Sequence, residues 1–167
     1  MEERLITYDR QAAIAYAHRW AYGFNPSYYN YSEIGGDCTN FASQCLYAGT
    51  GVMNYDPVYG WFYRNANDKA PAWTGVIYFY QFITRAEENA GPFGIEARLS
   101  ECRPGDFVQL SFDGTRFSHT PIIVSMGRRP TLYNTLVAAH SNPADYRPLS
   151  SYPARALRFL HILGARS

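Results

Sequence analysis

The chain has 167 residues and a formal net charge of +1, a length that suits one domain with a core of its own. Hydrophobic residues make up 47% and charged residues 17%, which excludes a disordered chain. Lys and Arg form no run, which argues against nucleic acid or an anionic membrane as a partner. No segment has the length and apolar character needed for membrane insertion.

The first half of the sequence predicts helices. In residues 8–22, Ala13, Ala17 and Trp20 recur at three- and four-residue spacing, and Gly23 follows as a stop signal. A second helix is expected over residues 37–48, before Gly49 and Gly51. A third is expected over residues 74–89, with Thr74 as its N-cap.

The second half predicts strands. Short runs rich in Val, Ile, Leu and Phe, separated by turn residues, cover 106–112, 119–126, 136–140 and 157–163. Asp113-Gly114 between the first two runs is a hairpin signal. We therefore expect a single α+β domain over residues 1–167, with N-terminal helices packed on a C-terminal antiparallel sheet.

Cys38 is the first candidate for chemistry, because it opens the second helix directly after Gly35, Gly36 and Asp37. The positive end of the helix dipole favours a thiolate at this position, and the unpaired N–H groups there can stabilise an oxyanion. The glycines allow a substrate backbone to approach closely. By position alone, an inert buried cysteine is an equally good interpretation. Cys45, in the middle of the helix, is expected to be core.

Two histidines could complete a cysteine-based site. His119 begins a predicted strand, where its ring could face a helix packed on the sheet and take the proton of a thiol. His140 ends the next strand and could orient that imidazole as the third member of a triad. Asn142 and Asp145 compete for the third position.

The chain has three cysteines, an odd number, so at least one thiol lies outside any disulfide. The spacing of its cysteines and histidines matches no metal-binding motif, since there is no C-x-x-C pair and no H-E-x-x-H. We therefore expect no metal and no cofactor. The N-terminus has no apolar leader, which indicates a cytoplasmic chain as given, or an extracellular one if a leader was removed. The sequence fixes neither the oligomeric state nor whether this is a whole protein.

The twelve residues from Gly35 to Leu46, GGDCTNFASQCL, resemble the signature of the bacterial putative amidase domain family. That family is similar to the NlpC-type and CHAP-type cell-wall hydrolases, which have a papain-like fold. The resemblance covers nearly the whole chain, because further matching segments follow in the family's order: Tyr8-Asp9-Arg10, the aromatic middle, Pro104-Gly105-Asp106, His119-Thr120 and Ala139-His140-Ser141.

This resemblance implies a cysteine-dependent amidase or peptidase that forms a thioester. By position, Cys38 matches the nucleophile, His119 the base and His140 the polar third residue. We expect a peptide or peptidoglycan-type substrate in a groove. Its binding residues are expected among Asp37, Tyr29, Tyr31, Trp61 and Trp73, with either tyrosine able to assist the oxyanion hole; packing alone could equally explain the aromatic middle.

Two other functions remain open on the same fold. An acyl transferase of transglutaminase type would use the same thioester and pass it to an amine instead of water. A binding module that has lost its activity is the other alternative. The combination of Cys38, His119 and His140 with a glycine-lined approach argues against this last hypothesis.

Overall fold

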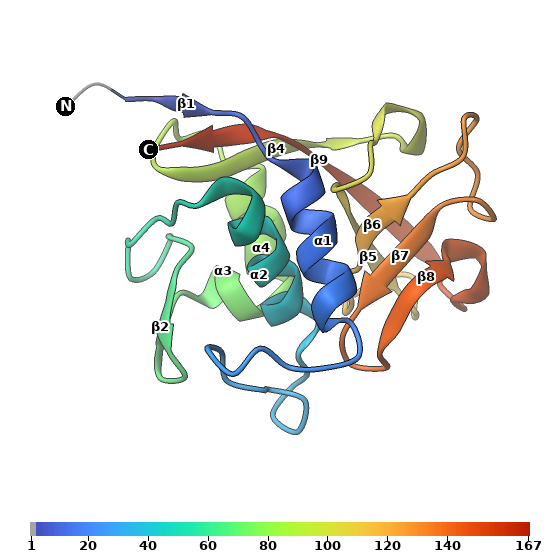
Figure 1. Ribbon diagram of the computed structural model, residues 1–167, viewed down its shortest axis with the longest axis horizontal. Coiled ribbons are helices and arrows are strands. Elements are labelled where there is room, and N and C mark those ends of the chain that lie inside the picture. Colours follow the sequence, from blue (N-terminus) through green and yellow to red (C-terminus); the bar gives the residue numbers. More distant parts are fainter. Residues whose placement is uncertain (1–2) are drawn as a thin grey trace.

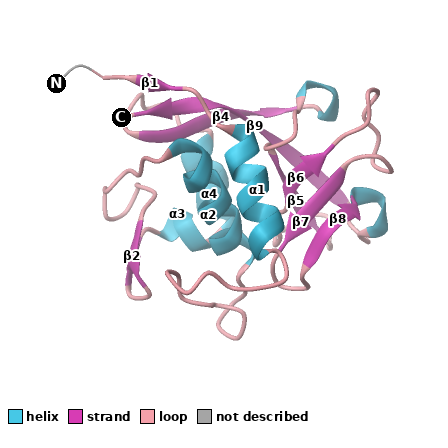
Figure 2. Cartoon of the chain, viewed as in Figure 1, coloured by secondary structure: helices cyan, strands magenta, loops and turns pink. Residues whose placement is uncertain are grey.

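The computed structural model describes residues 3–167 as a mixed helix-and-sheet fold (Figures 1 and 2). Its main sheet is curled and antiparallel, with strands in the order β1-β9-β5-β6-β7-β8, and β4 also pairs with β9. The helices cover one face of this sheet. The expected order of helices first and an antiparallel sheet afterwards is therefore observed.

Helix α1 (Arg10–Trp20) begins where Asp9 accepts a hydrogen bond from the Ala12 N–H, as an N-cap does. Helix α2 (Cys38–Thr50) ends at Gly51, whose φ of 69° is the left-handed cap conformation that glycine adopts without strain. Two shorter helices, α3 (Pro71–Thr74) and α4 (Val76–Ile83), follow in the middle of the chain.

The strands have the bounds β1 (Leu5–Ile6), β4 (Gly91–Ala97), β5 (Phe107–Ser111), β6 (Ile122–Ser125), β7 (Leu136–Ala139), β8 (Ala144–Pro148) and β9 (Ala156–Arg166). A small separate sheet pairs β2 (Tyr63–Asn65) with β3 (Asp68–Lys69), and two 3₁₀ turns cover Leu99–Glu101 and Leu149–Ser151. The expected hairpin around Asp113-Gly114 joins β5 to β6.

Two parts of the prediction were wrong. The third helix was expected to continue to Asn89 but α4 ends at Ile83, and the Gly91 and Pro92 expected as turn residues begin β4. The reason is tertiary: β9 is eleven residues long, and β4 pairs with it from Gly91↔Arg166 to Ala97↔Phe159. Strand β8 was likewise not predicted, because Asn142-Pro143 resembles an open loop rather than a hairpin turn.

The core lies between α2 and the sheet. Helix α2 is buried around most of its circumference, which is the pattern of a central helix rather than a surface one. Cys45 is fully buried there, as expected. Ala48, predicted to face inward, is exposed instead.

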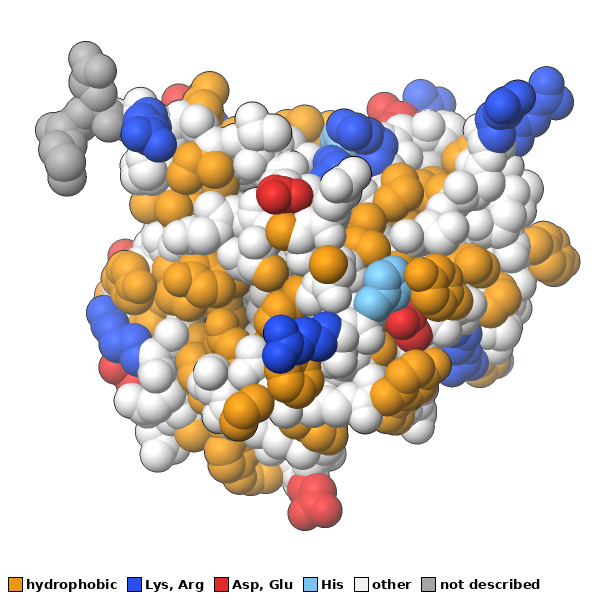
Figure 3. All heavy atoms as spheres, in the orientation of Figure 1, with side chains coloured by type: hydrophobic (Ala, Val, Ile, Leu, Met, Phe, Trp, Pro, Cys, Tyr) orange, Lys and Arg blue, Asp and Glu red, His pale blue; other side chains and the backbone are white. Residues whose placement is uncertain are grey.

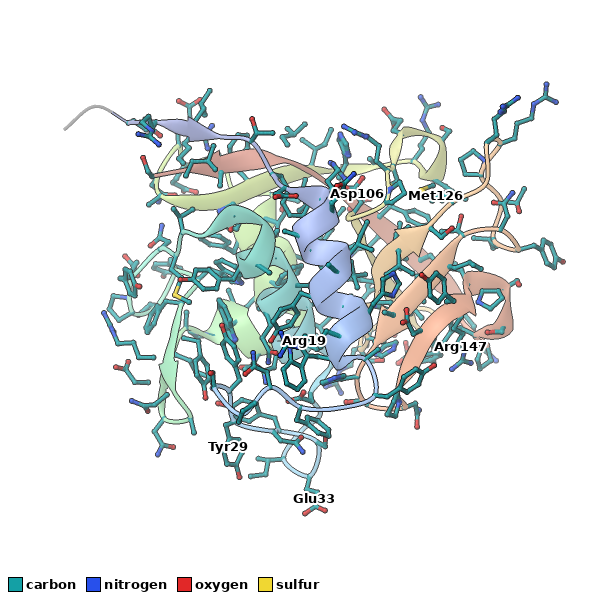
Figure 4. The ribbon with its side chains drawn as sticks, in the orientation of Figure 1. Arg19, Tyr29, Glu33, Asp106, Met126 and Arg147 are labelled. Atoms are coloured by element: carbon teal, nitrogen blue, oxygen red, sulfur yellow. The ribbon has the colours of Figure 1, made fainter. Side chains whose placement is uncertain are left out.

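Asp106 joins the start of α1 to the sheet, as Figure 4 shows near the N-terminal end of that helix. Its fully buried carboxylate lies 2.8 Å from Arg10 Nη1 and 2.7 Å from His161 Nδ1, and it accepts the Ile162 N–H. The Tyr8 hydroxyl donates to Gly105 O. The Tyr8-Asp9-Arg10 and Pro104-Gly105-Asp106 segments therefore contact each other as one buried polar anchor.

In Figure 3 the basic and acidic side chains lie scattered over the visible face, without a block of one sign. Within residues 3–167, no helix has the length and apolar character needed to cross a membrane.

Candidate functional site

Cys38 occupies the first turn of α2, and Asp37 precedes it without capping the helix through its side chain. The Asp37 carboxylate instead accepts hydrogen bonds from the Tyr31 N–H and from Asn40 Nδ2. Among the described residues, no backbone carbonyl and no capping side chain accepts the N–H groups of Cys38 and Thr39, and the Thr39 N–H points to the Cys38 thiol. These N–H groups therefore remain as donors at the end of the helix.

Cys38 is 8% exposed and its Sγ lies 3.8 Å from Ser118 O, to which the thiol donates. His119 directly follows Ser118 in the chain, so the sulfur and the imidazole come from neighbouring places in the fold. The next residues along each segment are also joined, because the hydroxyls of Thr39 and Thr120 lie 3.1 Å apart. This contact ties the start of α2 to the segment that leads into β6.

His119 pairs with Leu110 as an isolated bridge ahead of β6, and its side chain is 7% exposed. Its ring nitrogens have no hydrogen-bond partner within the described part of the chain, including Cys38 and His140. The nearest aromatic neighbour recorded for the ring is Tyr152, at 5.7 Å between centroids. The imidazole is thus packed but has no partner that fixes its tautomer.

Cys38 and His119 line one pocket of about 330 Å³, a size in the range of small-ligand sites. Gly35 and Gly36 form its entrance side with φ values of +84° and +102°, which residues with a side chain rarely adopt. A second hollow of about 510 Å³ lies beside α1 and is larger, but no cysteine or histidine lines it. Of these two hollows, the pocket at the start of α2 is the one that a cysteine and a histidine line.

Burial is the largest cause of the pKa shifts of Cys38 and His119. It raises the pKa of the Cys38 thiol, against smaller lowering by hydrogen bonds from Thr39 and from the Thr120 backbone. It also lowers the pKa of His119 to about 4, with a further lowering by the charge of Arg147. The raised pKa of the Cys38 thiol is opposite in direction to the lowering that was expected at a helix end.

His140 does not contact His119 as a third triad member would. Its Nδ1 lies 2.6 Å from Asp37 Oδ2 and its Nε2 lies 2.7 Å from Trp20 O, so both nitrogens are occupied. The ring also stacks on Phe41 at 4.0 Å between centroids. The competitor Asp145 pairs with His18, and Asn142 lines the pocket without a recorded bond to His119.

The expected substrate-binding residues lie away from the pocket. Trp61 and Trp73 are 0% exposed, and their ring centroids lie 4.5 Å apart. They therefore belong to the core and do not form a groove wall. Tyr31 donates its hydroxyl to Ala66 O, and Tyr29, 44% exposed, packs edge-on against Tyr31. Figure 4 places Tyr29 on the loop beyond the helices, well apart from Arg147. Asp37 is buried and bonded within the protein.

Residues of the cysteine motif form hydrogen bonds with these two buried tryptophans. Asn40 Oδ1 accepts from Trp73 Nε1, and Ser43 Oγ accepts from Trp61 Nε1 while donating to Trp73 O. The polar residues of the motif therefore satisfy the buried indole N–H groups. The motif therefore contains the residues that support α2 as well as Cys38.

The pocket contains residues that the sequence did not single out, above all Arg147 on β8 and Tyr152 after it. Neither belongs to a motif, and only the hairpin from β7 to β8 brings them beside Cys38. Ser141 was named only as part of Ala139-His140-Ser141. Its Oγ accepts the Asp37 N–H at 2.8 Å. Residues 3–167 hold no cluster of three or more metal-ligating side chains.

Comparison with known proteins identifies the family. The model of the putative amidase domain matches residues 7–163, almost the entire chain. The chain belongs to the putative amidase domain family. This membership indicates amide hydrolysis in general. A relative in Bacillus subtilis (strain 168), "Uncharacterized protein YhbB", is 29% identical over 166 residues, which cover 96% of this chain and 52% of that protein. The chain thus spans about half the length of this relative. No solved structure matches the chain.

Proposed function

We propose that this putative amidase domain is a cysteine-dependent hydrolase of peptide amide bonds, with Cys38 as nucleophile and His119 as base. The observation that carries the proposal is that Cys38 and His119, 81 positions apart in the sequence, line the same pocket. A nucleophile at a helix N-terminus and a base on a facing strand correspond to a papain-like arrangement. We include that fold, and kinship with NlpC-type and CHAP-type hydrolases, in the proposal.

The reaction begins from a neutral thiol and a neutral imidazole. As Cys38 Sγ attacks the carbonyl carbon of the amide, its proton passes to His119 and a tetrahedral oxyanion forms. The imidazolium then gives this proton to the departing amine, leaving a thioester on Cys38. Water, deprotonated by His119, hydrolyses the thioester and regenerates the thiol. The low pKa of His119 keeps the ring available as a base at neutral pH.

The oxyanion has donors at the start of α2, because the Cys38 and Thr39 N–H groups are not used by the helix or by a cap. In such a site, N–H groups fixed before the reaction stabilise the charge that develops on the carbonyl oxygen. No tyrosine is needed for this role in the proposal. The first step requires the thiol to leave its contact with Ser118 O.

His140 has a positioning role in this proposal. Its ring nitrogens contact the Asp37 carboxylate and Trp20 O, so the ring bridges the residue before Cys38 and the end of α1. It holds Asp37, the residue immediately before the nucleophile, against the end of β7. The reacting groups are then the pair Cys38 and His119.

Cleavage of short peptides and of muropeptides from a peptidoglycan digest, followed by mass spectrometry, tests the proposal. Cys38→Ala should abolish product, while Cys102→Ser, which removes a second buried cysteine outside the pocket, should leave it. Circular dichroism shows whether each variant folds. Turnover by a folded Cys38→Ala variant contradicts the mechanism. Transfer of the acyl group to an added primary amine, visible as a mass shift, would replace hydrolysis by transfer.

A further inference from the structure

Within residues 3–167, Arg147 is the only Lys, Arg, Asp or Glu that lines the Cys38 pocket. The acidic residue closest to the nucleophile in sequence, Asp37, lies beneath the pocket with its carboxylate bonded to His140, Tyr31 and Asn40. The pocket wall therefore presents one fixed positive charge and no opposing carboxylate. Such a site favours a substrate that carries a negative group.

The guanidinium of Arg147 is held in one orientation. Its Nε donates to Ser151 Oγ at 2.8 Å, its Nη2 donates to Ser151 O at 3.2 Å, and its Cζ lies 3.6 Å from the centre of the Tyr152 ring. Nη1 has no partner among the described residues. A planar guanidinium fixed on one side with a terminal nitrogen remaining is well suited to a carboxylate.

The backbone before Arg147 is irregular in a way that aims this side chain. The β7–β8 register shifts between Val137↔Arg147 and Ala139↔Ala144, which places an extra residue in β8. Tyr146 there has φ of 53°, an uncommon left-handed conformation for a large side chain. Bulges of this kind redirect side chains and occur next to functional sites.

The bulge is held from α1. Asp145 lies 2.8 Å from His18 Nδ1, and the His18 ring stacks on Tyr146 at 4.6 Å between centroids. These two contacts hold the backbone of Tyr146 in its left-handed conformation, which a regular edge strand does not contain. Strain that is maintained by specific contacts beside a pocket is consistent with a functional requirement for the position of Arg147.

Tyr152 supports the Arg147 side chain from below. The guanidinium lies over the face of the Tyr152 ring, and the Tyr152 hydroxyl is buried. Burial raises the pKa of Tyr152, against a smaller lowering by the charge of Arg147 and a hydrogen bond from it, so the ring remains a neutral platform for the cation.

We propose that Arg147 binds a carboxylate of the substrate beside the amide bond that Cys38 attacks. The proposal rests on the proposed function and specifies its substrate class. A compact pocket of 330 Å³ is about 7 Å across and an extended residue spans about 3.5 Å. The carboxylate therefore belongs within one or two residues of the scissile bond, as a chain-terminal carboxylate or as an acidic side chain.

The test compares three peptides: acetyl-Ala-Ala-Ala with a free carboxylate, the same peptide as its carboxamide, and acetyl-Ala-Glu-Ala carboxamide. Wild type should cleave at least one carboxylate-bearing peptide about 100-fold faster in kcat/KM than the plain carboxamide. The faster of the two identifies the source of the carboxylate. Arg147→Met should remove this preference, because kcat/KM should fall much more for the carboxylate-bearing peptide than for the plain carboxamide.

Arg128→Met is the matched control, because Arg128 is exposed on the β6–β7 connection and lines no part of the pocket. It should retain the preference. Equal rates for all three peptides in wild type, or an equal loss on all three in Arg147→Met, overturns carboxylate recognition while the hydrolase assignment stands.

A binding measurement keeps the proposal falsifiable if none of the three peptides is cleaved. Calorimetric titration of folded Cys38→Ala with the same peptides should show tighter binding of a carboxylate peptide, and Arg147→Met in that background should abolish the difference. Equal Kd values for all three peptides contradict the proposed recognition of a carboxylate. Turnover by Cys38→Ala contradicts the nucleophile assignment instead, so the two failures are distinguishable.

Discussion

The hydroxyls of Thr39 and Thr120 lie 3.1 Å apart, each one position after a residue of the candidate pair Cys38 and His119. Gln109 Nε2 also donates to Thr120 Oγ1, at 3.3 Å, so the contact is part of a buried network on β5. Because Thr39 and Thr120 are separated by 81 positions, this bond fixes the helix end relative to the sheet. The spacing of sulfur and imidazole therefore depends on two side chains that do no chemistry themselves.

Thr120→Val is expected to reduce kcat/KM by about tenfold, because small displacements of reacting groups are costly. The free energy of unfolding should fall by about 1 kcal/mol, the usual contribution of one hydrogen bond. Thr135→Val is the matched control, since the Thr135 hydroxyl is buried without a partner. Peptide cleavage and urea unfolding measure both effects. A Thr120→Val enzyme with wild-type kcat/KM would show that the contact does not position the pair.

The activity should have an acidic limit near pH 4. His119 accepts the thiol proton only when neutral, and burial lowers its pKa to about 4. As pH falls through this value, kcat/KM should decline about tenfold per pH unit. A pH profile of kcat/KM, taken over the range in which circular dichroism shows a folded protein, checks this. A limb near pH 6.5 would show that the ring is not buried in the free enzyme.

Burial of a neutral His119 also predicts a pH dependence of stability. Between pH 6.5 and about 4, the unfolded chain binds a proton at this residue and the folded chain does not. The free energy of unfolding should therefore fall as pH decreases through this window, by about 3 kcal/mol at most. His119→Phe removes this contribution. The free energy of unfolding of wild type minus that of the variant, measured by urea unfolding, should therefore decrease by up to that amount as pH falls from 6.5 to about 4. A constant difference contradicts the prediction.

His140→Phe and Asp37→Asn should each destabilise the fold by about 3 kcal/mol, because each leaves a buried partner unpaired. The double variant should cost less than the sum of the two. His18→Phe provides a comparison, since the His18–Asp145 pair is more exposed. Thermal and urea unfolding measure the cycle. Additive losses would mean that the 2.6 Å contact contributes no coupling.

Trp73→Ala should behave as a core variant and not as a binding variant. The side chain is fully buried against Trp61 and donates to Asn40, so its removal should cost about 3–5 kcal/mol. Tyr29→Ala, at a 44% exposed position, should cost under about 1 kcal/mol. Urea unfolding of both variants distinguishes them. A folded Trp73→Ala protein of wild-type stability with a raised KM would restore the groove-wall hypothesis.

The sequence by itself determined the local features of the site. Glycine stops and apolar spacing located α1 and α2 to within a few residues, and the motif around Cys38 indicated the putative amidase domain family, to which the chain belongs. It also placed His119 on the strand side of the fold. These features depend on neighbouring residues, whose conformational preferences are visible in a single segment.

Only the tertiary structure decided what surrounds Cys38 and His119. The partners of His140, the burial that raises the pKa of Cys38, and the presence of Arg147 and Tyr152 in the pocket all depend on packing the start of α2 against sheet segments about 80 or more positions later in the chain. The desolvation of a side chain is a property of everything packed around it. A helix-start cysteine therefore predicts a nucleophile from sequence, whereas its resting charge and its pocket are set by the complete fold.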